Sequence, residues 1–166
     1  MLSKKIKSLK YQNRNFSINS KKIKRNDIFF AIDGLTQSGN YFILEAIANG
    51  ASAVVTSSGI KNQRYLRVHN VRKFLAEACS IKYKKKPKNI IAVTGTNGKS
   101  SVANFYYQIL KNLKINSAAI GTIGIHYKNK FKKTYLTTPD TITIHKELNF
   151  LKKNGIENVC LEASSH

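Results

Sequence analysis

The stretch from Ile90 to Ser101 constrains the fold of this chain more than any other. Four apolar residues, Ile90–Val93, predict a short buried strand and run into the loop Thr94-Gly95-Thr96-Asn97-Gly98-Lys99-Ser100, after which residues 102–110 have a helical pattern. Strand, glycine loop, Lys-Ser pair and helix together indicate a phosphate-binding loop, in which backbone N–H groups and the positive helix end meet phosphate oxygens. Lys99 would reach the outer phosphates and the Ser100 hydroxyl would bind Mg²⁺. The spacing is tighter than G-x-x-x-x-G-K-[ST], and an ordinary strand–turn–helix corner is the alternative interpretation.

The strong positive charge of the chain could indicate a nucleic-acid partner. The chain of 166 residues carries 29 Lys and Arg against 8 Asp and Glu, for a net charge of +21. Such a charge is typical of nucleic-acid-binding proteins. Here, however, lysines are spread through every segment and no arginine–aromatic module pattern occurs. We therefore expect no nucleic-acid partner, although a basic surface would attract an anionic nucleotide.

Cysteine usage and hydropathy indicate a cytoplasmic protein. Cys79 and Cys160 each lie within an apolar segment, which favours buried thiols in a reducing compartment over a disulfide framework. The lysine-rich N-terminus has no apolar run behind it, and no stretch approaches the roughly 18 apolar residues of a membrane span. We expect neither a signal peptide nor a membrane partner.

Strands alternate with helices along the chain, which predicts an α/β fold built on parallel sheets with crossover helices. A polar run at residues 83–88 would be a solvated linker between a first domain, 1–82, and a second, 89–166. The expected strands cover residues 27–32, 53–56, 65–68, 90–93, 117–120 and 158–161, with a hairpin of 125–127 and 131–135. The expected helices cover residues 41–49, capped by Asn40, and 71–81, 102–110 and 143–154, with Phe42, Ile43, Ala46, Ile47, Phe74, Leu75, Ala78 and Cys79 facing inward.

Glu162 follows the last apolar strand and is the candidate metal ligand. Ligands of parallel sheets bind at the carboxyl ends of the strands, where the phosphate loop also opens. A carboxylate at that edge can hold Mg²⁺ or its water opposite Ser100. The alternative is a surface glutamate at a strand end.

The loop Thr94–Ser101 resembles the shortened nucleotide loop of the Mur ligases, and the resemblance continues along most of the chain. Ser20, Asp27–Gly34 and Gly39–Val55 resemble the uridine-binding first domain of this family, and three further segments are similar to its central ATPase domain: Gly121-Thr122, Thr137-Thr138-Pro139-Asp140 and Glu162-Ala163-Ser164-Ser165-His166. The fold implied is a small α/β uridine-binding domain followed by the first part of a parallel-sheet P-loop ATPase domain.

The resemblance implies specific roles for single residues. Lys99 and Glu162 would be catalytic, and Ser100 and Glu162 would hold Mg²⁺. ATP would be bound by Gly95, Thr96, Asn97, Gly98, Lys99, Ser100 and Ser101. Ile18, Ser20, Leu35, Thr36 and Gln37 would hold the uridine diphosphate end of the second substrate, and Thr137, Thr138 and Ser164 its muramoyl-peptide end. Two positions depart from the family pattern, because Lys21 stands where Arg is common and Leu136 where Asn is frequent.

The activity implied is ATP-dependent amide formation. The Thr-Thr-Pro and Glu-x-Ser-Ser-His segments resemble those of the Mur ligases that join a third amino acid, meso-diaminopimelate or lysine, to UDP-N-acetylmuramoyl-dipeptide. Family members continue for several hundred residues beyond these segments, so we expect a fragment that is inactive alone and has an unpaired sheet edge. The alternatives are a decayed ligase that serves as a basic nucleotide- or nucleic-acid-binding protein, and another Mur-type ligase.

Overall fold

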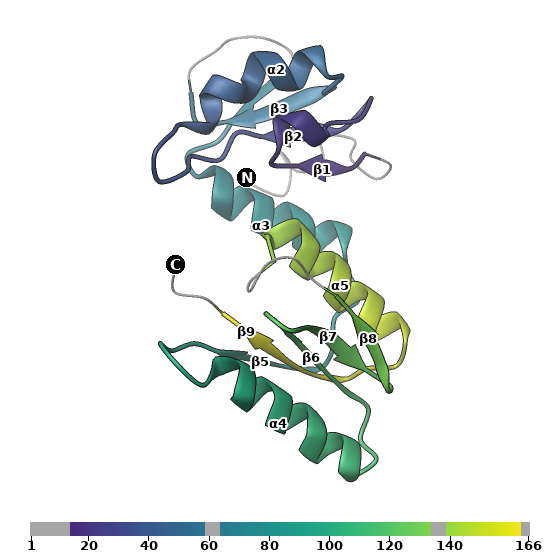
Figure 1. The fold of residues 1–166 in the computed structure, drawn as a ribbon. Coiled ribbons are helices and arrows are strands. Elements are labelled where there is room, and N and C mark those ends of the chain that lie inside the picture. Colours follow the sequence, from purple (N-terminus) through teal and green to yellow (C-terminus); the bar gives the residue numbers. More distant parts are fainter. Residues whose placement is uncertain (1–13, 59–63, 134–138, 164–166) are drawn as a thin grey trace. The chain divides into compact units, whose positions relative to one another are not determined.

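The computed structural model describes residues 14–58, 64–133 and 139–163, and the chain divides into two compact units, residues 1–82 and 83–166 (Figure 1). Unit 1 contains β1 (Phe16–Ser17), η2 (Ser20–Lys22), β2 (Ile28–Phe30), η3 (Gly39–Phe42), α2 (Ile43–Ala48), β3 (Ala53–Thr56), β4 (Tyr65–Arg67) and α3 (Val71–Lys82). Unit 2 contains β5 (Asn89–Val93), α4 (Lys99–Asn112), β6 (Ser117–Gly121), β7 (Gly124–Tyr127), β8 (Lys130–Lys132), α5 (Thr141–Lys153) and β9 (Asn158–Glu162).

Unit 1 is a parallel sheet covered by a helix on each face. Its four strands lie in the order β1-β2-β3-β4, and every residue of β2 and β3 is buried. Helix α2 packs through Ile43 and Ala46 on the face that carries Phe29. On the other face, the ring of Phe74 from α3 lies 6.4 Å from the ring of Phe30. Two covered faces explain why these strands are apolar without alternation.

The expected inward face of α3 is confirmed, whereas the expected start of the preceding helix is wrong. Phe74, Leu75, Ala78 and Cys79 are all buried. The segment expected to form one helix from residue 41 instead begins as the 3₁₀ turn η3, and Ser38 is its N-cap, accepting from Asn40 N at 3.3 Å. Asn40 is occupied elsewhere, because its Oδ1 accepts from Thr56 Oγ1 at 2.5 Å. The early turn leaves Phe42 37% exposed, so this residue is not part of the inner face.

Unit 2 is built on a mixed sheet with one helix on each face. The strand order is β5-β9-β6-β7-β8; β5, β9 and β6 are parallel, and β7 and β8 are antiparallel to their neighbours. The expectation of a parallel sheet therefore holds for three strands only, because the turn between β6 and β7 is too short for a crossover. Helix α4 packs Ala103 and Tyr107 against Cys160, and α5 packs Leu148 and Leu151 on the opposite face.

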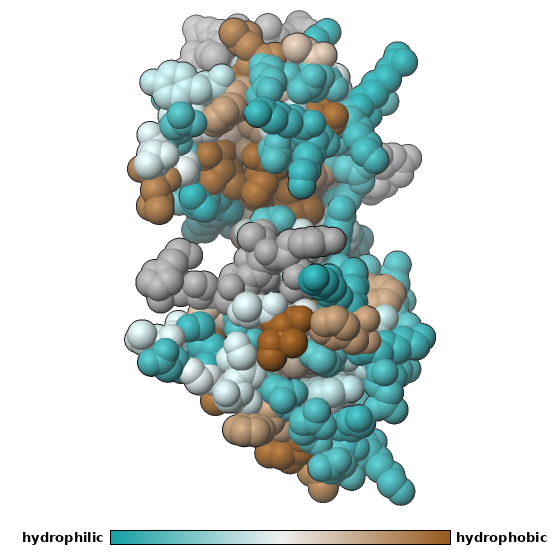
Figure 2. Space-filling model, viewed as in Figure 1, coloured by the Kyte–Doolittle hydropathy of each residue, from teal (hydrophilic) through white to brown (hydrophobic). Residues whose placement is uncertain are grey.

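The strand that precedes the glycine loop is exposed, which contradicts its expected burial. β5 lies at one edge of the sheet, and Ile90 and Ile91 are 40% and 44% exposed. Figure 2 shows hydrophobic surface on the part of unit 2 where α4 lies. Along that helix the exposed apolar side chains are Val102, Phe105, Ile109 and Leu113, which recur at helical spacing.

The polar run 83–88 has exposed side chains at Lys84, Lys85 and Lys88 but is also joined to unit 2 by backbone hydrogen bonds. Pro87 is buried, and Lys85 N donates to Asn149 Oδ1 at 3.2 Å. Lys88 N donates to Glu157 Oε2 at 3.1 Å. Backbone N–H groups find acceptors here although the side chains are charged, and composition does not reveal such contacts.

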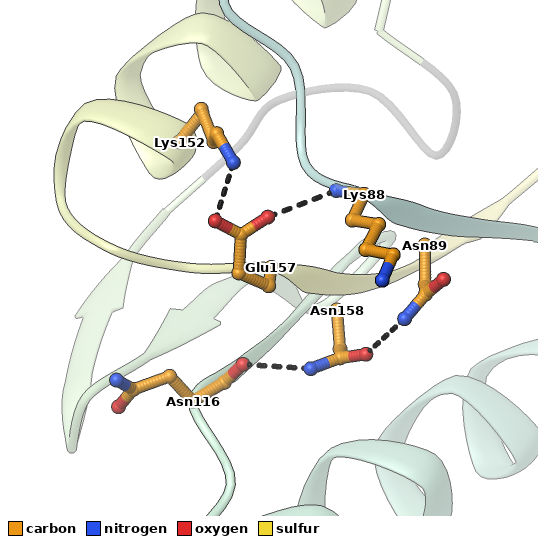
Figure 3. A network of polar contacts seen from close by, with 6 residues as sticks. All are labelled: Lys88, Asn89, Asn116, Lys152, Glu157 and Asn158. Carbon is orange, nitrogen blue, oxygen red and sulfur yellow. Dashed lines mark hydrogen bonds and ion pairs between the residues drawn. The ribbon is translucent and has the colours of Figure 1, made fainter.

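A polar network joins the amino ends of three strands of this sheet (Figure 3). Glu157, just before β9, accepts from Lys88 N and forms an ion pair with Lys152 of α5. Next along the chain, Asn158 Oδ1 accepts from the side chain of Asn89 at 2.8 Å, and Asn158 Nδ2 donates to Asn116 O at 3.3 Å. The network therefore ties β5, β9 and β6 together at the end opposite the glycine loop.

Both cysteines are free and buried. Among the helices that the structure describes, none has the length and apolar character needed to cross a bilayer.

Candidate nucleotide and metal site

The loop between β5 and α4 has a conformation that requires glycine at two places. Gly95 has a φ of 142° and Gly98 a φ of 79°, a region that residues with a side chain rarely adopt. Gly98 is the N-cap of α4 and supplies no side-chain cap. The first N–H groups of this helix therefore receive no hydrogen bond from an N-cap side chain, and together with the helix dipole they can bind an anion.

Lys99 lies in the first turn of α4 and folds back over the loop. Its Nζ donates to Gly95 O and, at 3.2 Å, to Thr96 O. The ammonium group thereby keeps the loop closed on itself. Because these carbonyls are solvent-exposed, exchange of one of them for a phosphate oxygen would replace a neutral acceptor with a charged one.

Glu162 lies at the carboxyl end of β9 and points toward the start of α4. It is 4% exposed, and its register partner on β5 is Val93, the last residue before the loop. Ser100 Oγ donates to Glu162 Oε2 at 3.0 Å. The structure thus brings together the two residues that the sequence suggested as metal ligands, one from each end of unit 2.

A third residue at this position, Thr122, was given no role in the sequence analysis, although Gly121-Thr122 is one of the segments that resemble the central ATPase domain of the family. Thr122 Oγ1 donates to Glu162 Oε2 at 3.0 Å, and Thr122 N donates to Glu162 Oε1 at 3.3 Å. Gly121 leaves the space, because a Cβ there would lie 1.9 Å from Oε1. The sequence does show that Thr122 carries a hydroxyl directly after an apolar strand. Only the order of strands, however, shows that this strand, β6, is a neighbour of β9.

The donor set fits magnesium better than a softer metal. Hydroxyl and carboxylate oxygens are the ligands that Mg²⁺ prefers, and Mg²⁺ usually takes one or two protein ligands together with waters and phosphate oxygens. Within residues 14–58, 64–133 and 139–163 no group of three or more His, Cys, Asp or Glu could form an all-protein cage. Ser100 and Glu162 would therefore hold the ion jointly with a bound phosphate.

The expected uridine residues of unit 1 follow two neighbouring strands. Ile18 and Ser20 come after β1 and, with Asn19, Lys21 and Phe42, line an open pocket of about 440 Å³. The Ser20 hydroxyl is already used, since it donates to Glu45 Oε2 at 2.5 Å. The pocket also offers a ligand the apolar side chains of Ile18 and Phe42.

Leu35, Thr36 and Gln37 form an exposed loop after β2, which pairs with β1. Asp33 braces this loop, because its Oδ1 accepts from Ser38 Oγ at 2.5 Å and from Gly39 N at 3.0 Å. These hydrogen bonds lower the pKa of Asp33 below its ordinary value. The three expected contacts to the muramoyl peptide, Thr137, Thr138 and Ser164, lie outside the described residues.

Comparison with known families matches both units. Residues 14–83 match the model described as Mur ligase family, catalytic domain, and residues 93–166 match the Mur ligase middle domain. The chain belongs to the Mur ligase family. This agrees with the resemblance found in the sequence, and the α/β architecture agrees with it as well.

Two relatives of this Mur ligase chain share the name of one ligase. UDP-N-acetylmuramoyl-L-alanyl-D-glutamate--2,6-diaminopimelate ligase of Rickettsia montanensis is 43% identical over 173 aligned residues, which cover 99% of this chain and 36% of the relative. The ligase of the same name from Rhizobium meliloti (strain 1021) is 38% identical, with 89% of this chain and 31% of the relative covered. The chain thus spans about a third of the length of these relatives.

Solved structures similar to this chain are also those of Mur ligases. A structure of UDP-N-acetylmuramoyl-L-alanyl-D-glutamate--2,6-diaminopimelate ligase superposes with a TM-score of 0.74 at 29% identity, covering 92% of this chain and 32% of that one. MurF ligase from Thermotoga maritima in complex with ADP superposes with a TM-score of 0.59 at 25% identity, covering 93% and 33%.

Proposed function

We propose that this chain supplies the nucleotide-binding and uridine-binding parts of an ATP-dependent ligase of peptidoglycan precursor synthesis. The ligase adds the third amino acid of the stem peptide, diaminopimelate or lysine, to UDP-N-acetylmuramoyl-L-alanyl-D-glutamate in the cytoplasm. The observation that carries the proposal is the hydrogen-bonded pair Ser100 and Glu162. The pair lies at the N-terminus of α4, which begins with Lys99 and has no side-chain cap. The substrate named for the ligases of Rickettsia montanensis and Rhizobium meliloti supports this choice of substrate.

Each residue of the loop has a task in this function. Gly95–Gly98 and the first turn of α4 bind the phosphates of ATP through backbone N–H groups, and Lys99 neutralises the outer phosphates. Ser100 and Glu162 hold Mg²⁺, which when bound neutralises charge on the phosphates. In unit 1, Ile18, Ser20 and the loop Leu35–Gln37 bind the uridine diphosphate end of the second substrate. Thr137, Thr138 and Ser164 contact its muramoyl peptide.

The reaction has two steps that conserve atoms and charge. A carboxylate oxygen of the D-glutamyl residue attacks the γ-phosphorus of ATP, and ADP leaves. The amine of the incoming amino acid then attacks the carbonyl carbon of the acyl phosphate, inorganic phosphate leaves, and the amine loses a proton. Positioning and charge neutralisation supply most of the catalysis in such a phosphoryl transfer, which suits a site made of Lys99, Ser100, Glu162 and backbone donors.

Nucleotide titration of the chain tests the proposal. ATP and ADP are titrated by calorimetry with Mg²⁺ and, separately, with EDTA, for the wild type, Lys99→Ala and Lys111→Ala. Lys111 lies in the last turn of the same helix and is exposed, so its substitution removes the same charge from the far end of α4. We expect Lys99→Ala to weaken Mg-ATP binding about 10- to 100-fold, since hydrogen bonds to charged groups contribute about 1.5–3 kcal/mol. We expect Lys111→Ala to bind within twofold of the wild type.

Equal binding by all three proteins, or no binding by the wild type, contradicts the nucleotide site. An equal loss in both variants would mean that the net positive charge, rather than the loop, attracts the nucleotide. Repeating the titration at higher salt separates these two cases, because a general charge effect is screened more strongly than a direct contact.

A further inference from the structure

We propose that Gly121 and Thr122 form a cradle that orients the Glu162 carboxylate for metal binding, with Thr122 as a positioning residue. The inference rests on the proposed nucleotide and magnesium site. It assigns the orientation of the Glu162 carboxylate to residues that follow Ile120 of β6, outside the loop Gly95–Ser101.

Thr122 contacts both oxygens of the carboxylate. Its backbone N–H donates to Oε1 at 3.3 Å, and its hydroxyl donates to Oε2 at 3.0 Å. Two donors from one residue resist rotation of the carboxylate about χ3, a torsion that is otherwise broad for Glu. The Oε2 atom that Thr122 contacts is also the atom that accepts from Ser100. Thr122 therefore presents to Ser100, and to an ion beside it, a carboxylate of defined orientation.

Gly121 makes this contact possible because it has no side chain. A Cβ at this position would lie 1.9 Å from Oε1 and 2.3 Å from the carboxyl carbon of Glu162. The closeness follows from the sheet, since Ile120 and Leu161 are register partners on β6 and β9. Any larger residue at Gly121 would push the Glu162 side chain away from Ser100.

Burial makes the orientation consequential. Glu162 is 4% exposed, so water can substitute for a lost hydrogen-bond donor only to a limited extent. Residues that orient a metal ligand typically change metal affinity 10- to 100-fold when they are removed. Thr122 itself is exposed, so replacement of its hydroxyl leaves the core of unit 2 intact.

The test compares Thr122→Val with Thr122→Ser. Valine keeps the shape and the backbone N–H but loses the hydroxyl, whereas serine keeps both donors. The readout is the ratio of ADP affinity in Mg²⁺ to ADP affinity in EDTA, which is internal to each protein and does not depend on activity. We expect Thr122→Val to reduce this ratio about tenfold with ADP affinity in EDTA unchanged, and Thr122→Ser to keep the ratio within about threefold.

Gly121→Ala is the second variant, and it is expected to reduce the same ratio by displacing the carboxylate. A thermal unfolding curve for each variant establishes that it is folded at the titration temperature. If Thr122→Val or a folded Gly121→Ala keeps the wild-type ratio while Ser100→Ala loses it, the cradle is refuted and the magnesium site stands. If the wild type itself shows no difference between Mg²⁺ and EDTA, the magnesium site of the proposed function fails, and the cradle with it.

Discussion

Ser100 Oγ and Glu162 Oε2 lie 3.0 Å apart although 62 residues separate them in the chain. The two side chains meet because β5 and β9 are adjacent parallel strands whose carboxyl ends coincide, and because α4 starts directly after the loop that leaves β5. Their proximity is therefore a property of the sheet order.

Ser100→Ala is expected to abolish most of the magnesium dependence of nucleotide binding. The variant removes one of the two side chains proposed to hold the ion, and it also removes one donor from the buried Glu162 carboxylate. We expect the Mg²⁺-to-EDTA ratio of ADP affinity to fall at least about tenfold. Ser100→Thr retains a hydroxyl in the same place and is the matched control. A ratio that survives in Ser100→Ala would show that the ion is held without this residue.

Gly98→Ala is expected to weaken both stability and nucleotide binding. A φ of 79° costs an alanine about 1 kcal/mol relative to glycine, and relaxation of that strain would distort the phosphate loop. Gly155→Ala provides the comparison, because Gly155 has a φ of 76° and follows α5 at the other end of unit 2. Urea unfolding should show similar losses for the two variants, whereas calorimetry should show weaker ADP binding for Gly98→Ala alone. Equal ADP affinity of the two variants would contradict the prediction that the conformation of Gly98 is needed for nucleotide binding.

Stability is expected to fall at acidic pH partly through Glu157. The hydrogen bond from Lys152, the N–H of Lys88 and the charges of both lysines lower the pKa of Glu157 below its ordinary 4.5. Its contribution is therefore fully present above pH 4.5 and is lost as the pH falls through the lower pKa of the folded state. Urea unfolding between pH 3 and pH 6 should show a flatter pH dependence for Glu157→Gln than for the wild type. Lys152→Met should flatten it in the same direction, and an unchanged slope in both would contradict the pKa shift.

The exposed apolar stripe of α4 is expected to cause self-association. Phe105 and Ile109 are 63% and 59% exposed and lie one turn apart on the same helix. In roughly 0.15 M salt, charges more than about 8 Å apart are largely screened, which weakens the repulsion between positively charged copies. Sedimentation velocity should show concentration-dependent association that decreases in Phe105→Gln/Ile109→Gln. Stability should change by less than about 0.5 kcal/mol, because both side chains are more than half exposed. A wild type that stays monomeric at high concentration would show that the exposed apolar side chains of α4 do not form a contact surface.

Much of the fold follows from local sequence patterns. The strand at Ala53–Thr56 has the expected bounds because it is a short apolar run buried on both faces. Helix α4 starts at Lys99 rather than at the expected Val102, since its first turn is polar and faces the loop, where hydrophobic periodicity gives no signal. The capping error at Asn40 has a similar cause: Ser38 and Asn40 are both good caps, and the distant Thr56 decides between them.

The candidate site could be predicted only as far as single segments allow. The loop motif identifies Lys99 and Ser100, and the strand-end rule identifies Glu162, because both depend on adjacent residues. Thr122 could not be found in that way, since its contact requires knowledge that β6 lies beside β9. The exposure of Ile90 was also beyond reach, because a run of apolar residues does not say how many neighbours its strand has.

The pairing of Val93 with Glu162 has a consequence for how the site tolerates change. Successive residues of a strand face opposite sides of the sheet, so a shift of one residue between β5 and β9 would turn Glu162 away from Ser100 without any change in the loop itself. The distant hydrogen bond between Asn89 and Asn158 helps to hold this alignment from the other end of the same two strands. If the proposed magnesium site is correct, a substitution of Asn89 or Asn158 that weakens this alignment is expected to lower magnesium affinity, although neither residue lies near Ser100 or Glu162.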